Sequence, residues 1–266
     1  MGSYISSSSE SVENTANSLI FHPSNSSKEE FDNIYDDIKF INSTNENKIC
    51  VIHLCPRHKS EKYLIWCHGN SGDLLHISDY LKHLCNKLNV HVIAFDYQGY
   101  GLSEGFPSEE GCYDDLKNVV DYVNSLNVSN KDIYLFGHSL GTGVVVDYAS
   151  KYNWKTPIVL ISPYKTMAKV MVDSSCIDAT SSSINYCSGK HVDKFRSEAK
   201  IQNVICPVKI FHGENDQLIN ISHGMKLYEL LQNKTFEPTW IDNANHNDIL
   251  GMIDLHDFKN VLSSIF

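Results

Sequence analysis

Positive charge is scarce in this 266-residue sequence. Lysine and arginine together number 22 against 32 aspartates and glutamates, which gives a formal net charge of -10 at pH 7. The basic residues are scattered along the chain and form no run or cluster. Nucleic-acid binding is therefore not expected, because contact with a phosphate backbone needs concentrated positive charge.

Long hydrophobic runs are also missing. No apolar stretch approaches the ~18 residues that a membrane-spanning helix needs. The N-terminus lacks the charged-then-apolar layout of a secretory signal. We therefore expect a cytoplasmic protein with at most a peripheral contact to membranes, and we expect it to be a monomer.

Spacings typical of metal and nucleotide sites are absent as well. The eight cysteines and thirteen histidines form no zinc-binding pattern. In a domain of this size, single cysteines inside strand and helix patterns are typical of reduced core residues. Gly99, Gly101 and Gly105 do not fit the Gly-x-Gly-x-x-Gly pattern of dinucleotide binding. The sequence therefore predicts no metal and no cofactor.

What the sequence contains is a regular alternation of strand and helix patterns. Residues 1–17 are rich in Ser, Asn and Glu and are predicted to form a disordered tail, and residues 18–266 to form one α/β domain. This alternation favours a mostly parallel central sheet with helices on both faces. The predicted strands are Leu19–Phe21, Ile34–Ile41, Ile49–Cys55, Tyr63–Cys67, Val90–Asp96, Ile133–Phe136, Ile158–Ser162, Val208–His212 and Pro238–Ile241. The predicted helices are Ile77–Leu88, Glu110–Leu126, Leu140–Lys151, His223–Leu231 and Ile249–Ile265.

One stretch in this pattern has the features of a nucleophile elbow. Gly137-His138-Ser139-Leu140-Gly141 lies between a predicted strand and a predicted helix, where a strained turn would expose the serine hydroxyl. Glycines are needed on both sides because such a turn is too tight for a Cβ. The alternative is a glycine-rich packing turn with an unreactive serine.

An oxyanion hole is predicted beside this turn. His68-Gly69-Asn70 follows the predicted strand Tyr63–Cys67. In a serine hydrolase this loop supplies a backbone N–H, here that of Asn70, opposite the N–H of the residue after the nucleophile, here Leu140. The alternative is an ordinary turn between a strand and a helix. His68 is interpreted as a residue that orients the loop.

A serine needs a histidine base, and the base needs a carboxylate to fix its tautomer. Both follow later in the chain, in the order acid and then histidine that this fold uses. Asp216 is the predicted acid, with Glu214 as a nearby rival, because both follow the strand ending at His212. His246 is the predicted base, on the loop before the last helix; the alternative is an exposed loop histidine. Asp248 is predicted to cap that helix.

Taken together, these motifs resemble the α/β-hydrolase superfamily, and within it the short-lidded branch that includes the α/β-hydrolase-domain protein depalmitoylases. The resemblance runs from about Ile20 to the C-terminus and implies hydrolysis of acyl esters or thioesters. Those depalmitoylases carry an acylated N-terminal cysteine cluster, whereas the first cysteine here is Cys50. The matching segments are His68-Gly69-Asn70, Asp96-Tyr97, Gly99-Tyr100-Gly101, Ser103, Gly105, Gly137, Ser139, Gly141-Thr142, Ser162-Pro163, His212-Gly213, Asp216 and His246-Asn247-Asp248.

Two further segments bear on the substrate. Residues 163–206 leave room only for a short lid, in which Met167, Val170 and Met171 have helical spacing and could line an acyl groove. Packing of that face onto the sheet is the alternative. Residues 174–190 are polar and are expected to be flexible. Met1-Gly2-Ser3-Tyr4-Ile5-Ser6 fits the N-myristoylation pattern at Gly2, unless the match arises by chance.

The sequence thus predicts a serine hydrolase that uses Ser139, Asp216 and His246 and forms an acyl-enzyme. Its expected partners are acylated proteins or lipid esters, and the favoured substrates are long-chain S-acyl groups on proteins. A lysophospholipid or monoacylglycerol lipase and a general carboxylesterase are alternatives. A catalytically silent binding protein on the same fold is the alternative of another class.

Overall fold

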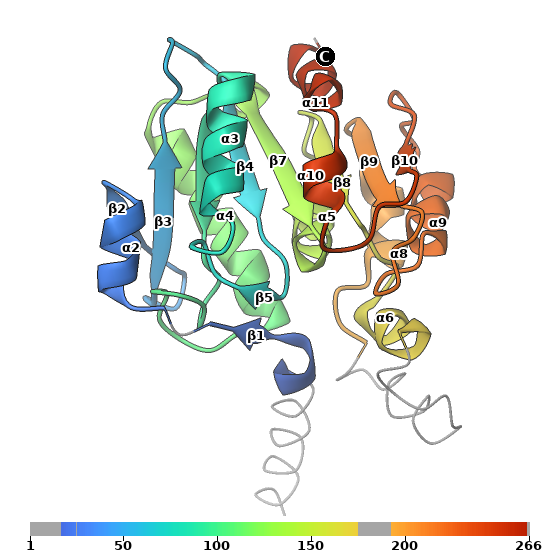
Figure 1. The fold of residues 1–266 in the computed structure, drawn as a ribbon, viewed down its shortest axis with the longest axis horizontal. Helices are drawn as coiled ribbons and strands as arrows, with labels where there is room; N and C mark the ends of the chain where they lie inside the picture. The colour runs from blue at the N-terminus through green and yellow to red at the C-terminus, as the bar shows by residue number, and fades with distance from the viewer. Residues whose placement is uncertain (1–16, 25, 175–192, 265–266) are drawn as a thin grey trace, which may run out of the picture.

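The computed structural model describes residues 17–24, 26–174 and 193–264 (Figure 1). Its main sheet has eight strands in the order β10-β9-β8-β7-β4-β6-β3-β2. The strands from β10 to β6 are parallel, and β3 and β2 are antiparallel to their neighbours. The strands are β2 Ile38–Asn42, β3 Lys48–Leu54, β4 Tyr63–Cys67, β6 His91–Phe95, β7 Ile133–His138, β8 Ile158–Ile161, β9 Val208–Gly213 and β10 Thr239–Ile241.

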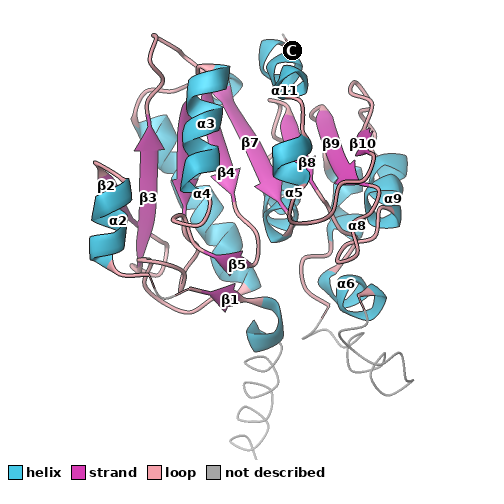
Figure 2. Cartoon of the chain, viewed as in Figure 1, coloured by secondary structure: helices cyan, strands magenta, loops and turns pink. Residues whose placement is uncertain are grey.

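Helices cover both faces of this sheet (Figure 2). One face packs against α3 (Ser78–Leu88), α10 (Ile249–Met252) and α11 (Leu255–Ser263), and its buried cluster includes Trp66 and Phe258. The other packs against α4 (Glu109–Ser125), α5 (Leu140–Lys151) and α9 (Ser222–Leu230), with a cluster that includes Ile65 and Val145. The predicted α/β class with a mostly parallel sheet is confirmed.

The predicted strands near the N-terminus are wrong in part. Residues 17–20 are helical where a strand at Leu19–Phe21 was predicted. Ile34, the first residue of the predicted strand Ile34–Ile41, is the last residue of α2 (Lys28–Ile34); residues 35–37 belong to neither element, and β2 begins only at Ile38. A capping box starts α2: the Ser27 hydroxyl accepts from the Glu30 N–H, and the Glu30 carboxylate accepts from the Ser27 N–H. This cap outweighs the β propensity of the isoleucine at the end.

The predicted C-terminal helix is two helices. α10 ends at Met252 and α11 starts at Leu255. Between them Ile253 has an extended backbone, and the Asp254 side chain accepts from the His256 N–H as the cap of α11. An internal cap of this kind starts a new helix direction. Near the end of α11, the Leu262 carbonyl accepts hydrogen bonds from Tyr134 Oη at 2.9 Å and from Lys62 Nζ, which ties α11 to the sheet.

Short elements complete the described chain. A small parallel pair joins β1 (His22–Pro23) to β5 (Ser71–Gly72). Between β8 and β9 lie α6 (Met167–Asp173), α8 (Ser197–Lys200) and the 3-10 turn η2 (Ile201–Asn203), and η1 (Asn130–Asp132) precedes β7. In the described ranges no helix has the length and apolarity required to cross a bilayer. The predictions for residues 1–16 and for most of 174–190 lie outside those ranges.

Candidate active site

Ser139 occupies the turn between β7 and α5 in a strained conformation. Its backbone has φ 52° and ψ -119°, which a non-glycine residue adopts only when its surroundings enforce it. The flanking glycines allow this because the chain passes too close for side chains. A Cβ on Gly137 would lie 2.5 Å from the Gly141 carbonyl oxygen, and one on Gly141 would lie 2.1 Å from the Cys67 carbonyl oxygen.

The hydroxyl of Ser139 contacts a histidine instead of capping α5. Ser139 is the N-cap residue, yet its side chain makes no capping bond. Its Oγ lies 3.0 Å from His246 Nε2, and His246 Nδ1 lies 2.8 Å from Asp216 Oδ2. All three residues are buried. The structure therefore aligns a hydroxyl, an imidazole and a carboxylate in the arrangement that nucleophilic catalysis by serine requires.

The loop after β9 fixes the Asp216 carboxylate. Oδ1 accepts the backbone N–H groups of Leu218 at 3.0 Å and Ile219 at 2.8 Å, which leaves Oδ2 for His246. Burial alone raises the pKa of Asp216, but the hydrogen bond and charge of His246 and the Ile219 N–H hold the pKa below its ordinary value. The side chain is thus a carboxylate at neutral pH.

Glu214, the rival acid, has a hydrogen bond with a different residue, whereas His246 contacts Asp216. It is exposed, and its neighbour is Asp242. The hydrogen bond with Asp242, together with the negative charge of that residue, raises the pKa of Glu214. A side chain in solvent next to another carboxyl cannot orient His246.

The loop that carries His246 is braced by Asp248, but not as predicted. Asp248 precedes α10, and its side chain makes no capping bond to that helix. Instead its Oδ1 accepts the Asn245 N–H at 2.6 Å. The cap prediction for Asp248 is wrong because the carboxylate closes a turn around His246, and the last helix is capped by Asp254.

The two residues of the predicted oxyanion hole line the pocket beside Ser139. Leu140 is the first residue of α5, and Asn70 follows β4. No acceptor for either N–H is found in the part of the chain that the structure describes. The loop is held through the Asn70 carbonyl, which accepts hydrogen bonds from the His22 N–H at 2.9 Å and from Tyr100 Oη at 2.7 Å. Two unpaired amides beside a serine hydroxyl suit an anionic oxygen.

His68 lies behind this loop. Its Nδ1 is 2.8 Å from the Gly69 carbonyl oxygen and its Nε2 is 3.6 Å from Asp96 Oδ1. Burial lowers the pKa of His68 to about 4. The ring is therefore neutral and structural at neutral pH, in line with a role in orienting the loop.

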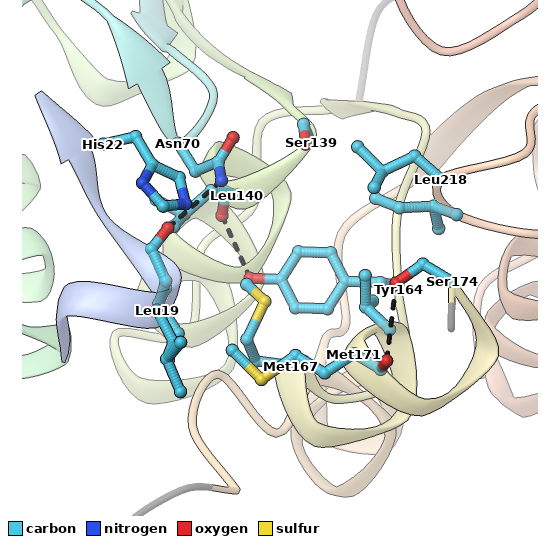
Figure 3. Close-up of a pocket in the computed structure, with 13 residues that line it drawn as sticks. Leu19, His22, Asn70, Ser139, Leu140, Tyr164, Met167, Met171, Ser174 and Leu218 are labelled. Carbon is cyan, nitrogen blue, oxygen red and sulfur yellow. Dashed lines mark hydrogen bonds between the residues drawn. The ribbon is translucent and has the colours of Figure 1, made fainter. Parts of the chain in front are cut away.

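An apolar pocket opens at Ser139 (Figure 3). Figure 3 shows Ser139 on one side, Met167 and Met171 on the other, and the Tyr164 ring between them in this view. Tyr164 donates a hydrogen bond to the Leu140 carbonyl at 3.2 Å. The pocket brings together the predicted site residues from the elbow, the Asn70 loop and α6. Its lining is Leu19, Ile20, His22, Asn70, Ser139, Leu140, Tyr164, Met167, Val170, Met171, Ser174, Leu218 and Ile219.

Sequence reasoning missed several contributions to this site, among them two leucines and a histidine. Leu19 and Leu218 line the pocket and are 47% and 38% exposed, so they form an apolar rim. Leu218 could have been found, since it directly follows the predicted acid. His138 stacks on His246, with ring centroids 5.5 Å apart and planes inclined by 26°. Removal from water lowers the pKa of His138 to about 3, so this ring is neutral.

Comparisons with known proteins place these features in a family. Residues 58–172 match the profile of a family described as "Serine aminopeptidase, S33". A protein of Acanthamoeba polyphaga mimivirus named alpha/beta hydrolase L404 is 44% identical over 232 residues, which are 86% of this chain and 84% of that protein. The human "Alpha/beta hydrolase domain-containing protein 17C" is 32% identical over 216 residues, 80% of this chain. The match spans only 61% of the human protein.

Solved structures agree on the fold. The Pyrococcus furiosus esterase Pf2001 superposes with a TM-score of 0.69 at 19% identity, over 91% of this chain and 95% of that one. The mouse alpha/beta hydrolase domain-containing protein 10 does so with a TM-score of 0.62 at 15% identity, over 85% of this chain and 100% of that one. At these identities the likeness is one of fold.

Proposed function

This chain belongs to the α/β-hydrolase superfamily, and from that membership we propose that it is a serine hydrolase of acyl esters and thioesters. Ser139 is the nucleophile, His246 the general base and Asp216 the residue that holds the base. The observation that carries the proposal is the opening of an apolar pocket at the serine whose hydroxyl already contacts an imidazole.

The acylation step follows from these contacts. His246 Nε2 takes the Ser139 hydroxyl proton while Oγ forms a bond to the acyl carbonyl carbon. Asp216 accepts the Nδ1–H of the imidazolium and so stabilises its charge. The protonated His246 then gives the proton to the departing sulfur or oxygen, and the acyl group remains on Ser139.

The backbone amides of Leu140 and Asn70 stabilise the intermediate. The carbonyl oxygen becomes negatively charged as the carbon turns tetrahedral, and both N–H groups donate to it. In the second half of the cycle His246 deprotonates a water while the water oxygen bonds to the acyl carbon. The bond from that carbon to Ser139 Oγ then breaks, His246 returns the proton to Oγ, and the carboxylic acid leaves. Loss of one such donor in a related site costs about 10² to 10³ in kcat.

Long-chain acyl groups are the proposed preference. Met167, Val170 and Met171 on α6 face the pocket with Leu19 and Leu218 at its rim. An acyl chain bonded to Ser139 would lie on this surface and leave water. Each buried methylene contributes about 0.8 kcal/mol, which is roughly a fourfold gain in kcat/KM per carbon as long as the groove continues.

A thioester on a protein is the favoured substrate within this class. A thiolate, with a reference pKa of about 8.5, leaves without much help, whereas an amine must be protonated as it departs. The chain between β8 and β9 spans only residues 162–207, and its described helices α6 and α8 have seven and four residues. A short lid suits a bulky polypeptide leaving group better than a large apolar cap would.

The decisive measurement is a series of S-acyl peptides from acetyl to palmitoyl, assayed beside the matching oxyesters and a lysophospholipid. We expect kcat/KM to rise steeply with chain length and to be highest for the peptide thioesters. Met171→Gln should flatten the dependence, whereas Met225→Gln, at an exposed methionine on α9 outside the pocket, should not. A flat profile, or faster turnover of the lysophospholipid, would leave a general esterase or a lipase.

A binding protein without activity is distinguished by a simpler experiment. Fluorophosphonate probes react with an activated serine hydroxyl and not with an ordinary one. We expect labelling of the wild type and none of Ser139→Ala. Absence of labelling in a folded wild-type protein would favour the silent alternative.

A further inference from the structure

Three potential metal ligands converge at the end of the sheet remote from Ser139. His53 Nε2 lies 3.0 Å from His91 Nδ1, and Cys55 Sγ lies 3.8 Å from His53 Nε2. The three donor atoms all lie within 4.8 Å of one another. We propose that His53, Cys55 and His91 bind a divalent metal ion of the Zn²⁺ type.

The register of the sheet brings these residues together. β3 and β6 are antiparallel, with His53 opposite Ile93 and Leu54 opposite Val92. Continued by one residue, the same register sets Cys55 opposite His91. Residues two apart on a strand share a face, so His53 and Cys55 point to the same side as His91. Strand pairing therefore positions His53 and His91, and Cys55 follows as the first residue after β3.

The distances suit a small tetrahedral ion. With Zn–N near 2.05 Å and Zn–S near 2.3 Å, tetrahedral angles require about 3.3 Å between two nitrogens and about 3.6 Å between nitrogen and sulfur. The separations of 3.0 Å between the two nitrogens and 3.8 Å between Cys55 Sγ and His53 Nε2 differ from these by a few tenths of an ångström, and the third pair, Cys55 and His91, lies within 4.8 Å. Side-chain rotations of that size are available to a half-buried histidine and an exposed cysteine.

The ring of His91 is already oriented for such a role. It stacks on Tyr63, with centroids 4.3 Å apart and planes inclined by 8°. It also has a hydrogen bond with the backbone of Ser60. Because Nδ1 faces His53, this bond falls to Nε2, which holds the proton there and leaves the Nδ1 lone pair toward the cluster. Metal-binding histidines are commonly oriented through their second nitrogen in this way.

The donor set selects the kind of ion. One thiolate and two imidazoles favour Zn²⁺ and similar late transition metals over Mg²⁺ or Ca²⁺, which prefer oxygen. On binding, the Cys55 thiol loses its proton to solvent, and the N–H shared between the two rings moves to the far nitrogen of its ring. Cys55 is exposed, so the fourth position opens to water and the ion can exchange.

The site is separate from the proposed catalytic centre. His91 is the first residue of β6, whereas Ser139 follows the last residue of β7, which runs parallel to β6 through β4. The two sites therefore lie at opposite ends of the parallel strands. Metal binding there would clamp β3 to β6 without contacting the acyl pocket.

The test is a Zn²⁺ titration of the full, tag-free chain after reduction and removal of metals, with a chromophoric competitor. We expect one ion per chain, with affinity reduced at least roughly tenfold in Cys55→Ser and in His91→Gln. With Co²⁺ in place of Zn²⁺, the wild type should show a thiolate-to-cobalt charge-transfer band that Cys55→Ser lacks. Bound metal should raise the Tm of the wild type, and it should raise the Tm of Cys55→Ser and His91→Gln much less.

Matched variants separate this site from other thiols and histidines. His58→Gln changes an exposed histidine near the cluster whose only recorded hydrogen bond in the described chain is through its backbone, and it should bind as the wild type does. Cys176→Ser with Cys187→Ser should also bind normally. Each variant is checked for wild-type thermal unfolding without metal. Wild-type affinity in Cys55→Ser or His91→Gln, or no saturable binding by the wild type, would overturn the proposal. The cluster would then be only a hydrogen bond between two histidines with a cysteine nearby.

Discussion

His223 in α9 donates a hydrogen bond from Nε2 to Asp173 Oδ2 over 2.8 Å. Its other ring nitrogen accepts the Lys165 N–H at 3.1 Å. Lys165 precedes α6 and Asp173 is its last residue, so one buried side chain holds both ends of the helix that carries Met167 and Met171.

Replacing His223 with alanine should therefore loosen the acyl pocket without touching the reacting groups. We expect KM for palmitoyl thioesters to rise about tenfold, while kcat/KM for an acetyl ester stays within about twofold, because a short acyl group does not reach α6. Lys226→Ala, at a partly exposed residue of the same helix, is the control. Equal losses on both substrates would show that His223 acts on the fold as a whole.

Removal of the nucleophile or the base should abolish most turnover. Ser139→Ala and His246→Ala should each lose nearly all activity, and the double variant should lose little more, because the groups act as a unit. Steady-state kinetics of the three variants with one thioester measure this, with circular dichroism as the check on folding. Additive losses would mean that the two residues work independently.

The acid is identified by a pair of substitutions. Asp216→Asn should lower kcat by roughly 10⁴, because an amide at this position favours the wrong tautomer of His246. Glu214→Gln should leave kcat near the wild-type value, since that side chain is exposed. The reverse pattern would move the acid to Glu214.

The close backbone approach at the elbow predicts a strong effect of one methyl group. In Gly141→Ala the new Cβ would lie 2.1 Å from the Cys67 carbonyl oxygen, so β4 or α5 must shift. We expect a loss of about 3 kcal/mol in the free energy of unfolding and loss of fluorophosphonate labelling. Gly251→Ala, where no atom lies within 4 Å of the added Cβ, should be neutral or slightly stabilising. Urea denaturation compares the two.

His212 predicts a pH dependence of stability. Burial lowers its pKa to about 4, against 6.5 for an exposed histidine. Between these two pH values the unfolded chain binds more protons than the folded protein does. The contribution of neutral His212 to the free energy of unfolding is therefore complete above pH 6.5 and is lost as the pH falls to about 4. The full span is roughly 3 kcal/mol.

His212→Gln keeps an N–H donor for the Ile219 carbonyl, which His212 Nε2 contacts at 2.7 Å, and removes the titration. As the pH falls from 7 to 4.5, the wild type should therefore lose stability relative to the variant. Asp115, whose pKa burial raises to about 7, acts in the opposite sense but cancels because both proteins contain it. Parallel stability profiles would contradict the assignment to His212.

Gly2 predicts a reversible membrane association. Co-expression with an N-myristoyltransferase should add one myristoyl group, seen by intact mass and absent in Gly2→Ala. A single myristoyl group without a basic patch binds membranes weakly, so the modified protein should distribute between vesicles and solution. An unmodified Gly2 under these conditions would reject the proposal.

The local parts of the site could be predicted from the sequence because they depend on short-range sterics. The elbow is one example: Gly137 and Gly141 are needed wherever a strand turns so sharply into a helix, and α5 has the predicted bounds. The order of Asp216 and His246 along the chain also follows from the fold, although their distances could not be known before the loops were placed.

Other parts of the structure depend on competition between local signals, or on the pairing of distant strands, and neither can be read from the sequence. The cap at Ser27 outweighs a strand pattern, and Asp254 divides a continuous apolar periodicity into two helices. The proposed metal cluster departs from the expectation of no metal. Its His-x-Cys segment meets His91 only through the antiparallel register of β3 and β6, which no spacing rule along one strand reveals.

The attachment of α11 to the sheet through Leu262 has a consequence for biosynthesis. Ser139 leaves the ribosome 107 residues before His246, and the bonds from Tyr134 and Lys62 to the Leu262 carbonyl form later still. Domains emerge and fold from the N-terminal side. A nascent chain therefore carries Ser139 without the histidine that contacts it, and the proposed site stays incomplete until residues 246–262 have also been synthesised and folded.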